Sequence, residues 1–422
     1  MTQSQVKIDA LPAFFRDIEI IGPAVHEIPK YKALHASLLF ASSAKQNIEV
    51  TADSSPVLLA SRSVKEIYQS NNFSQIKDME RKAQNDLQAI YTNVSQNGTN
   101  AWTKVRSQGK DFYMSWSDTG SMWSFTDSIT QTAKKNQDGE TTYQAKVQIG
   151  TYTQTGKIAG IHTYNLTLPT LLVESVVALI VAKAVSGIIA DGLGFLVANF
   201  AMYLTSAAAE LGLESFSFFI SEALLATVAS CLVFAVVFIG LAYLWDWLNR
   251  QYTIRLQIFN WDGDHDWNAD GQYMSNAKIS GDNSTFDFNL PKLTKPGNIV
   301  TPPGFQPVEA LESVCYYAVI IWQNDSTFMQ GCSAALRMQR DGSSDGFMWA
   351  FDCPRWSDNQ QASTNGTSDP KTYLNNPNWN NNPKNFSIES TSSKTPINLA
   401  LDALSGASDN LYNFIININK KS

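Results

Sequence analysis

The sequence predicts an α+β multidomain protein with an N-terminal helical bundle, an apolar helical hairpin and a C-terminal antiparallel β-sandwich. Three observations support this prediction: a helical apolar stripe in the first part, a nearly uncharged block in the middle, and two-residue alternation in the last part. Residues 168–250 contain only 8 charged residues among 83, whereas their neighbours have ordinary charge. This contrast predicts a mainly helical soluble region at 1–167, the hairpin at 168–250 and the sandwich at 251–422.

The amino-acid composition excludes several classes of protein. The chain has 422 residues, of which 44% are hydrophobic and 16% charged, so it can form a sizeable core and is not disordered. Its 31 basic and 38 acidic residues give a net charge of −7, which argues against nucleic acid as a partner. The four cysteines form no CxxC pair, and no secretory signal is visible at the N-terminus. We expect a protein released or secreted without a recognisable signal peptide, soluble before it reaches a target-cell membrane.

The first region contains the clearest local pattern. Apolar residues recur at helical spacing from Ile76 to Val94 with charged residues between them, which predicts a helix from about Ser74 to Val94. Large apolar residues between Trp102 and Ile129 are interpreted as a continuation of this stripe. Tyr143 to Ile149 alternates apolar and polar residues, which predicts a short strand or hairpin before the apolar block.

The second region suggests contact with a membrane. Residues Ala223 to Trp245 contain no charge over 23 positions, and about 20 residues suffice for a helix to cross a bilayer. Aromatic residues and Arg250 follow, as is typical of a headgroup boundary. The predicted membrane-inserting residues are Ala223, Leu224, Val228, Phe234, Phe238, Tyr243, Trp245 and Trp247.

The upstream arm, Leu168 to Ala209, is equally apolar but carries a few charges. Glu174, Lys183 and Asp191 are costly if they face lipid, so we expect them to face a pore lumen or a neighbouring helix. The acidic residues Glu210, Glu214 and Glu222 are predicted to form the tip between the two arms. A row of small residues at four-residue steps, which runs from Ala178 to Ala198, favours close packing against another helix.

The third region alternates apolar and polar residues, as strands with one buried face do. Candidate strands begin near Tyr252, Phe286, Cys315, Gly331 and Gly346, and the chain closes with another at 412–418, which makes a β-sandwich the expected fold.

Two loops in the third region are candidate binding sites. The acidic loop WDGDHDWNADG resembles a calcium loop in its spacing, but it lacks the glycine and glutamate that an EF-hand requires. Calcium binding and an acidic solvated turn remain the two alternatives for its carboxylates, which are Asp262, Asp264, Asp266 and Asp270. An Asn-rich loop with Tyr373 and Trp379 is a candidate contact for a glycan or lipid receptor.

No catalytic motif is convincing. The four histidines form no metal-ligand pattern, and no P-loop or dinucleotide fingerprint occurs. A G-x-S-x-G match at 342–346 lies between two predicted strands, where a nucleophile elbow needs a helix after it. We therefore predict no enzyme activity, no catalytic residues and no cofactor other than the possible calcium ion.

The order of the regions resembles that of α-helical pore-forming toxins, loosely the cytolysin A and Cry6 group. The resemblance is carried by Ile76–Val94, Leu168–Leu248 and Glu210–Glu222 and covers about the first 250 residues, with no motif matched residue by residue. It implies a cytolysin that is soluble at first, then inserts its apolar hairpin into a lipid membrane and forms a homo-oligomer. The substantial β-region at the end of the chain departs from that group.

Two other classes of protein fit the same sequence. An integral membrane protein with two or three spans and an external β-domain would contain the same apolar block. A soluble carbohydrate-binding protein would instead bury that block as a central hairpin. Release of dye from liposomes by detergent-free protein would separate these alternatives from the toxin.

Overall fold

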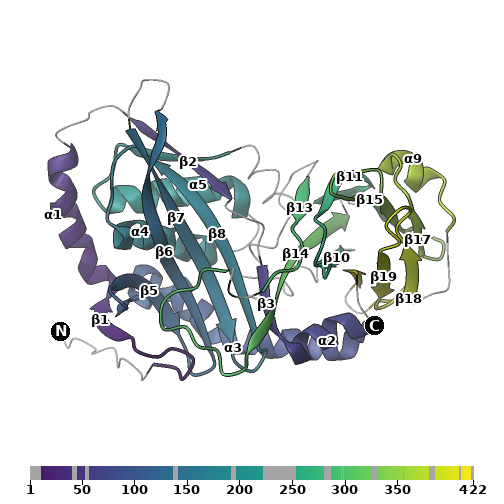
Figure 1. Cartoon of the computed structure of the whole chain (residues 1–422), viewed down its shortest axis with the longest axis horizontal. Coiled ribbons are helices and arrows are strands. Elements are labelled where there is room, and N and C mark those ends of the chain that lie inside the picture. The colour runs from purple at the N-terminus through teal and green to yellow at the C-terminus, as the bar shows by residue number, and fades with distance from the viewer. Residues whose placement is uncertain are drawn as a thin grey trace.

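The fold is built mainly from β-strands (Figure 1). The computed structural model describes residues 11–39, 45–52, 57–135, 141–191, 196–221, 253–279, 287–295, 297, 299–324, 331–354, 356–379, 385–407 and 410–419. Within these ranges, fifteen strands form one large mixed sheet and five form a second sheet. The predicted N-terminal helical bundle is therefore wrong, and with it the fold class and the architectural resemblance to α-helical pore-forming toxins.

The large sheet runs through both lobes of the molecule. Its main strand order is β1-β4-β5-β6-β7-β8-β3-β14-β10-β20-β19-β18, while β12 pairs with β14, and β2 pairs with β8 and β9. The bounds of the strands in the N-terminal lobe are Glu19–Pro23 (β1), Gln46–Ala52 (β2), Val57–Ser61 (β3), Thr103–Ser107 (β4), Lys110–Trp116 (β5), Gly120–Lys135 (β6), Thr141–Thr153 (β7), Ile158–Leu168 (β8) and Phe216–Ile220 (β9). The antiparallel pairing of β3 with β14 joins this lobe to the C-terminal one.

The C-terminal lobe stacks the second sheet on the large one. The large sheet contributes β10 (Thr253–Asn260), β12 (Ala277–Ile279), β14 (Leu311–Asn324), β18 (Asn385–Glu389), β19 (Pro396–Leu401) and β20 (Leu411–Ile418). The second sheet has the order β13-β11-β15-β16-β17, with bounds Phe288–Leu290, Trp267–Ser275, Cys332–Arg340, Gly346–Cys353 and Gln360–Asn365 in that order. Buried rings connect the two sheets, since Trp349 stacks on Trp322 and meets Phe414 edge to face. Most of the strands predicted in the third region are confirmed, and this part of the chain is a sandwich of two sheets.

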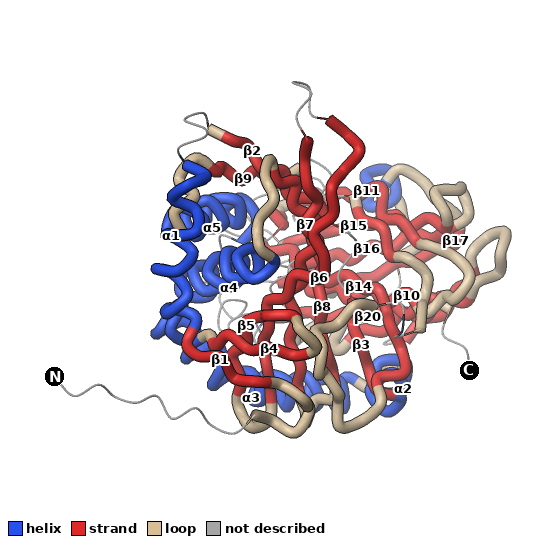
Figure 2. The backbone as a smooth tube through the Cα atoms, turned by 60° about the vertical axis from the view of Figure 1, so that its left-hand side comes forward, coloured by secondary structure: helices blue, strands red, loops and turns tan. Residues whose placement is uncertain are grey.

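Helices cover one side of the N-terminal part of the sheet (Figure 2). The helices of the described chain before the C-terminal lobe have the bounds Ala24–Glu27 (η1), Ile28–Leu39 (α1), Arg62–Ser70 (α2), Phe73–Asn97 (α3), Gly98–Ala101 (η2), Glu174–Asp191 (α4) and Leu196–Glu210 (α5). Helix α9 (Pro370–Asn375) instead packs on β11, β15 and β16 of the second sheet. The predicted helix at 74–94 is confirmed as α3, where the Asn72 side chain accepts a hydrogen bond from the Gln75 amide and caps the first turn.

The expected helical continuation from Trp102 to Ile129 is wrong, because this stretch forms β4, β5 and most of β6. Phe112, Tyr113 and Met114 are all fully buried, and so are Met122 and Trp123. Strands buried on both faces lose the two-residue alternation that distinguishes a strand from a helix in a sequence.

The core of this lobe lies between α4 and the sheet. Thirteen of the 18 residues of α4 are buried, and the helix packs on β5, β6 and β7 as well as on α3 and α5. A helix that is apolar all round is expected in such a position. In the described part of the chain, no helix is long and apolar enough to cross a membrane.

Candidate functional site

The apolar block begins with α4 and α5, which form an antiparallel pair. Lys183 in α4 lies 2.6 Å from Glu210 at the end of α5 and also donates to the Thr99 hydroxyl. Asp191, the last residue of α4, accepts a hydrogen bond from the Tyr203 hydroxyl. Glu174 lies 4.0 Å from Lys110 of β5. These three predicted contact residues therefore pair with groups on neighbouring elements of the same chain.

Polar contacts fix the position of α4 against the sheet. The Ser124 hydroxyl of β6 donates to the Ala178 carbonyl at 2.7 Å, and the Trp102 indole donates to the Ser186 hydroxyl at 2.8 Å. At the start of the helix, Ser175 accepts a hydrogen bond from Tyr31 of α1. Because such bonds form only in one register, they position a helix whose apolar surface alone would allow sliding.

The described part of the predicted acidic tip contains a turn and a strand. Glu210 ends α5, Glu214 is exposed in the turn that follows, and the chain then enters β9. Gly212 in this turn has φ +84° and lies against Lys32 of α1, which brings α1 close to the turn. Among the described residues, α4 and α5 form a helical hairpin before this turn, and the second predicted arm lies outside the described residues.

All predicted membrane-inserting residues lie outside the described residues. They are Ala223, Leu224, Val228, Phe234, Phe238, Tyr243, Trp245 and Trp247, and the tip residue Glu222 lies outside as well. The described residues that flank this segment are Ser221 after β9 and Thr253 at the start of β10.

The first flank leaves the sheet near the end of β8. Strand β9 pairs in parallel with β2, which places Ile220 beside Val50. Val50 in turn lies opposite Leu166 of β8, two residues before that strand ends at Leu168.

The second flank enters the sheet at a similar level. Both β14 and β8 run antiparallel to β3, and Tyr316 of β14 and Ile161 of β8 both pair with Val57. Thr253 pairs with Gln323, which is seven residues beyond Tyr316 on β14. The same step along β8 leads from Ile161 to Leu168, so Thr253 is level with the last residue of β8. Both ends of the undescribed segment are therefore held by one sheet, at the same end of it.

Exposed apolar side chains gather near the first flank. Phe219 of β9 is 46% exposed and Met202 of α5 is 55% exposed. The two elements touch through the Thr205 hydroxyl, which accepts from the Phe218 amide at 2.9 Å. Exposed large apolar residues also occur on α1 and on the loop before α4, and they are Leu34, Leu171 and Val173. This layer of α1, α4, α5 and β9 (Figure 2) thus offers water several apolar side chains, and Phe219 is two residues before the first flank, Ser221.

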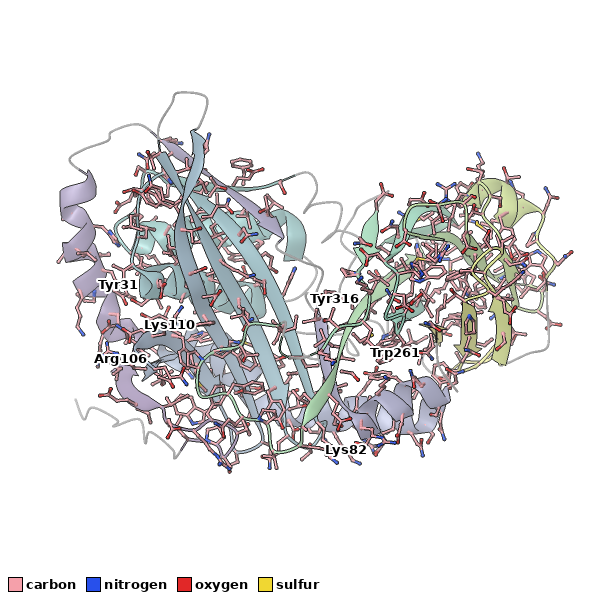
Figure 3. The ribbon with its side chains drawn as sticks, viewed as in Figure 1. Tyr31, Lys82, Arg106, Lys110, Trp261 and Tyr316 are labelled. Carbon is pink, nitrogen blue, oxygen red and sulfur yellow. The ribbon has the colours of Figure 1, made fainter. Side chains whose placement is uncertain are left out.

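A buried ionic cluster lies beneath this layer. Lys104 of β4 is 2.8 Å from Glu27 and 3.0 Å from Asp111, and its ammonium also reaches the Tyr31 hydroxyl. Tyr31 shares a hydrogen bond with Tyr113, so the cluster joins η1, α1, β4 and β5. Figure 3 shows Tyr31, Arg106 and Lys110 around this part of the fold. Sequence reasoning missed the cluster because its members are far apart in the chain.

The cluster shifts the pKa values of its members. Burial opposes charge on Glu27 and Asp111, but the adjacent cations outweigh burial and lower the pKa of both carboxyls. Burial also opposes charge on Lys104, and the two carboxylates outweigh it and raise the pKa of the ammonium. The groups are thus charged and paired with one another. We interpret the cluster as structural, because it holds η1, α1, β4 and β5 together.

Three carboxylates of the acidic loop make contacts within the fold. Asp262 is 1% exposed and accepts hydrogen bonds from the Asp264 amide and the Trp267 indole. Asp266 accepts from the Lys292 amide, and Asp270 pairs with an arginine of β15 at 2.7 Å. Among the described residues, no three His, Cys, Asp or Glu side chains are grouped so that they could hold a metal ion. We propose no calcium site here.

The predicted receptor residues lie on the outer face of the second sheet. Tyr373 and Trp379 are half-buried and pack against a small apolar cluster that includes Ala335, Ala350 and Leu374. Burial raises the pKa of the Tyr373 phenol. Their role as a glycan or lipid receptor contact stays a prediction.

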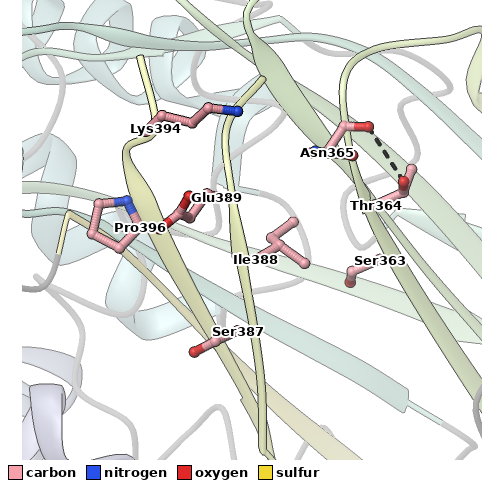
Figure 4. A pocket seen from close by; sticks show the side chains of 8 residues that line it. All are labelled: Ser363, Thr364, Asn365, Ser387, Ile388, Glu389, Lys394 and Pro396. Carbon is pink, nitrogen blue, oxygen red and sulfur yellow. Dashed lines mark hydrogen bonds between the residues drawn. The ribbon is translucent and has the colours of Figure 1, made fainter. Parts of the chain in front are cut away.

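A polar depression lies nearby, between the edge strands β17 and β18 (Figure 4). Its volume is about 550 Å³, and it is lined by Ser363, Thr364, Asn365, Ser387, Ile388, Glu389, Lys394 and Pro396. The depression is shallow, and it contains neither aromatic side chains nor a buried charge.

The G-x-S-x-G match forms the turn between β15 and β16, where Gly342 has φ +67°. The Ser343 hydroxyl donates to the Arg340 carbonyl, as in a hydrogen-bonded turn. Comparison with known proteins adds no candidate, because no family model and no curated protein matches this chain.

Proposed function

We propose that this protein attaches to a lipid membrane from one side, through the uncharged segment Ala223–Trp245 and the exposed apolar side chains beside its first flank. One observation carries the proposal: a 23-residue run without charge is inserted between two strands of a single sheet. A segment of this composition prefers an apolar phase to water.

The topology favours attachment over crossing. A helix of 23 residues is about 34 Å long and could cross a hydrocarbon layer once, but its ends would then lie on opposite sides of the bilayer. Both flanks belong to one folded body, and only 31 residues separate Ser221 from Thr253. Two crossings need about 40 residues. With the body intact, the segment can enter and leave the membrane only from the same side, as monotopic segments do.

Apolar contact would supply the affinity. Each fully buried Phe, Leu or Val side chain contributes about 1.5–3 kcal/mol, so a few of them suffice to hold a protein at a bilayer. The net charge of −7 gives no general attraction to anionic lipids. We therefore expect binding to zwitterionic vesicles that changes little with salt.

The test is flotation of the full chain with phosphatidylcholine vesicles at low and high salt. We expect the protein to float in both, and Phe234→Asp/Phe238→Asp to reduce the floating fraction at least tenfold. Val308→Asp is the matched control, because Val308 is 63% exposed and precedes β14 at the opposite end of the sheet. It should float like the unchanged chain.

Two results would oppose the proposal. Unchanged chain that stays at the bottom of the gradient would exclude membrane attachment, and equal flotation of the double variant would exclude this segment. Dye trapped in the same vesicles should stay inside, and its release would indicate a pore rather than attachment.

A further inference from the structure

Two of the cysteines lie opposite each other on neighbouring strands. Cys332 is the first residue of β15 and Cys353 is the last residue of β16, and the antiparallel register makes them direct Cα partners. Cys332 is fully buried and Cys353 is 3% exposed. Neither is involved in the proposed membrane attachment, which concerns another part of the chain.

The register brings the two residues within the range of a disulfide. Directly opposed residues of an antiparallel pair have Cα atoms about 4.5 Å apart at non-hydrogen-bonded positions and about 5.5 Å apart at hydrogen-bonded ones. Natural disulfides join Cα atoms about 4.4–6.8 Å apart. Both kinds of position therefore allow the bond without moving the backbone far.

The side chains already face each other. A hydrogen bond between the two thiols raises the pKa of Cys332 and lowers that of Cys353, with burial opposing ionisation of both. Tyr412 beside Cys353 lowers its pKa further. Cys353 is also the more exposed of the two thiols, so we assign it the attacking role.

The third described thiol is placed differently. Cys315 lies on β14 of the large sheet, where it contacts the carbonyl oxygens of Asn260 and Tyr316 at 3.5 and 3.4 Å. It is fully buried and has no cysteine as its strand partner. It serves as an internal control for the pair.

We propose that Cys332 and Cys353 are an oxidation site, at which a disulfide links β15 to β16 when the protein meets an oxidised low-molecular-weight disulfide such as oxidised glutathione. Such a bond closes the hairpin at the end opposite its turn. The disulfide would stabilise the second sheet in an oxidising compartment. In a reducing compartment the two thiols would stay reduced.

The exchange balances in two steps. The Cys353 thiolate attacks one sulfur of oxidised glutathione, whose S–S bond breaks, and one glutathione thiolate leaves and takes up a proton. Cys332 then loses its proton to water, and its sulfur attacks the Cys353 sulfur of the mixed disulfide, from which the second glutathione leaves. The cysteine pair loses two electrons and two protons, and oxidised glutathione becomes two reduced molecules.

The test counts free thiols in denaturant after the native full chain has been incubated with oxidised or with reduced glutathione. We expect the count to fall from four to two with the oxidised form only, and the protein mass to fall by two hydrogen atoms. Oxidative refolding from denaturant is run in parallel, because it gives the buried pair time to react. Four free thiols after oxidative refolding would overturn the proposal.

Peptide mapping identifies the partners. Trypsin leaves Cys315 and Cys332 on one peptide, whereas Cys353 lies on the peptide 341–355, so the mapping uses Cys315→Ser. The cross-link should join these two peptides in that variant. A bridge that includes Cys231, or glutathione attached to a single cysteine as the final product, would also contradict the proposal.

A stability measurement distinguishes loss of the disulfide from misfolding of a variant. Oxidation should raise the midpoint of thermal unfolding of the unchanged chain and of Cys315→Ser by several degrees. Cys332→Ala/Cys353→Ala should unfold at the same temperature in oxidised and reduced buffer. An equal rise in the double variant would show that the effect comes from other thiols.

Discussion

The Glu80–Arg255 ion pair shows how single residues join the two lobes. Arg255 of β10 donates two hydrogen bonds of 3.1 Å to the Glu80 carboxylate of α3, and Gln257 adds a third of 3.0 Å. The side chains of Glu80 and Arg255 are 3% and 2% exposed. Breaking a buried pair by removing one partner is costly because it strands the other charge.

We expect Arg255→Met to lower the free energy of unfolding by about 3–5 kcal/mol, measured by urea denaturation. Glu80→Met/Arg255→Met should regain much of this loss, because no buried charge is left. If the double variant is no more stable than the single one, the stranded carboxylate is not the cause.

The Lys104 cluster predicts how stability depends on pH. The pKa values of Glu27 and Asp111 are lowered in the folded state by the nearby cations, against the effect of burial. A carboxyl group whose pKa is lower in the folded state stabilises the fold at pH values above its unfolded pKa of about 4. This contribution is lost as the pH falls through the pKa of the folded state. Stability should therefore fall as pH decreases from about 5 to 3.

Lys104→Met should lower the stability at pH 7 and make this acid-induced loss shallower, as measured by thermal unfolding at several pH values. Arg62→Met is the control, because the Arg62–Glu66 pair is exposed and such pairs contribute little. An unchanged pH profile in Lys104→Met would remove the cluster as the origin of the acid sensitivity.

At the level of elements, a glycine opens space for an indole ring in the large sheet. Gly150 of β7 is the Cα partner of Trp123 on β6, and a Cβ atom at Gly150 would lie 2.1 Å from the Trp123 ring. The ring is fully buried and donates to Gln148, so it has little freedom to move.

We expect Gly150→Ala to destabilise the protein by about 3 kcal/mol in urea denaturation. Gly263→Ala is the matched control, because no atom lies within 4 Å of its Cβ position, and it should change stability by less than about 0.5 kcal/mol. Equal stability of the two variants would show that the Trp123 ring does not need this space.

A helix with one solvated face could be predicted from the sequence, since the stripe from Ile76 to Val94 became α3. The alternation at 412–418 became β20, although every residue of that strand is buried. Strands β5 and β6 could not be predicted, because α4 covers one of their faces and residues such as Phe15 and Phe305 cover the other around Trp123. The apolar character of α4 has the same origin, since burial on all sides looks like a membrane helix in a sequence.

The candidate site was only partly predictable for a related reason. Sequence composition identifies Ala223–Trp245 as apolar, but it does not show where the flanks are held. The pairing of β9 with β2 and of β10 with β14 places them at one end of one sheet. Exposed residues such as Phe219 and Met202 carry no sequence signal, because their exposure depends on the packing of α5 against β9.

For the whole molecule, the continuous sheet is the feature that limits how it can meet a membrane. Strands from before and after the uncharged segment pair through β3 and β14, so both lobes must stay on the same side while the sheet is intact (Figure 1). Sidedness is therefore the property that separates attachment from crossing.

The most direct measurement is labelling of vesicle-bound protein with a maleimide that cannot cross a bilayer. Lys82→Cys in α3 and Lys371→Cys in α9 place exposed thiols before and after the segment in the chain, and the unchanged chain gives the background from the native cysteines. We predict that both positions are labelled as completely in intact vesicles as after detergent is added. Protection of either position until detergent is added would show that part of the body has crossed the membrane and would contradict one-sided attachment.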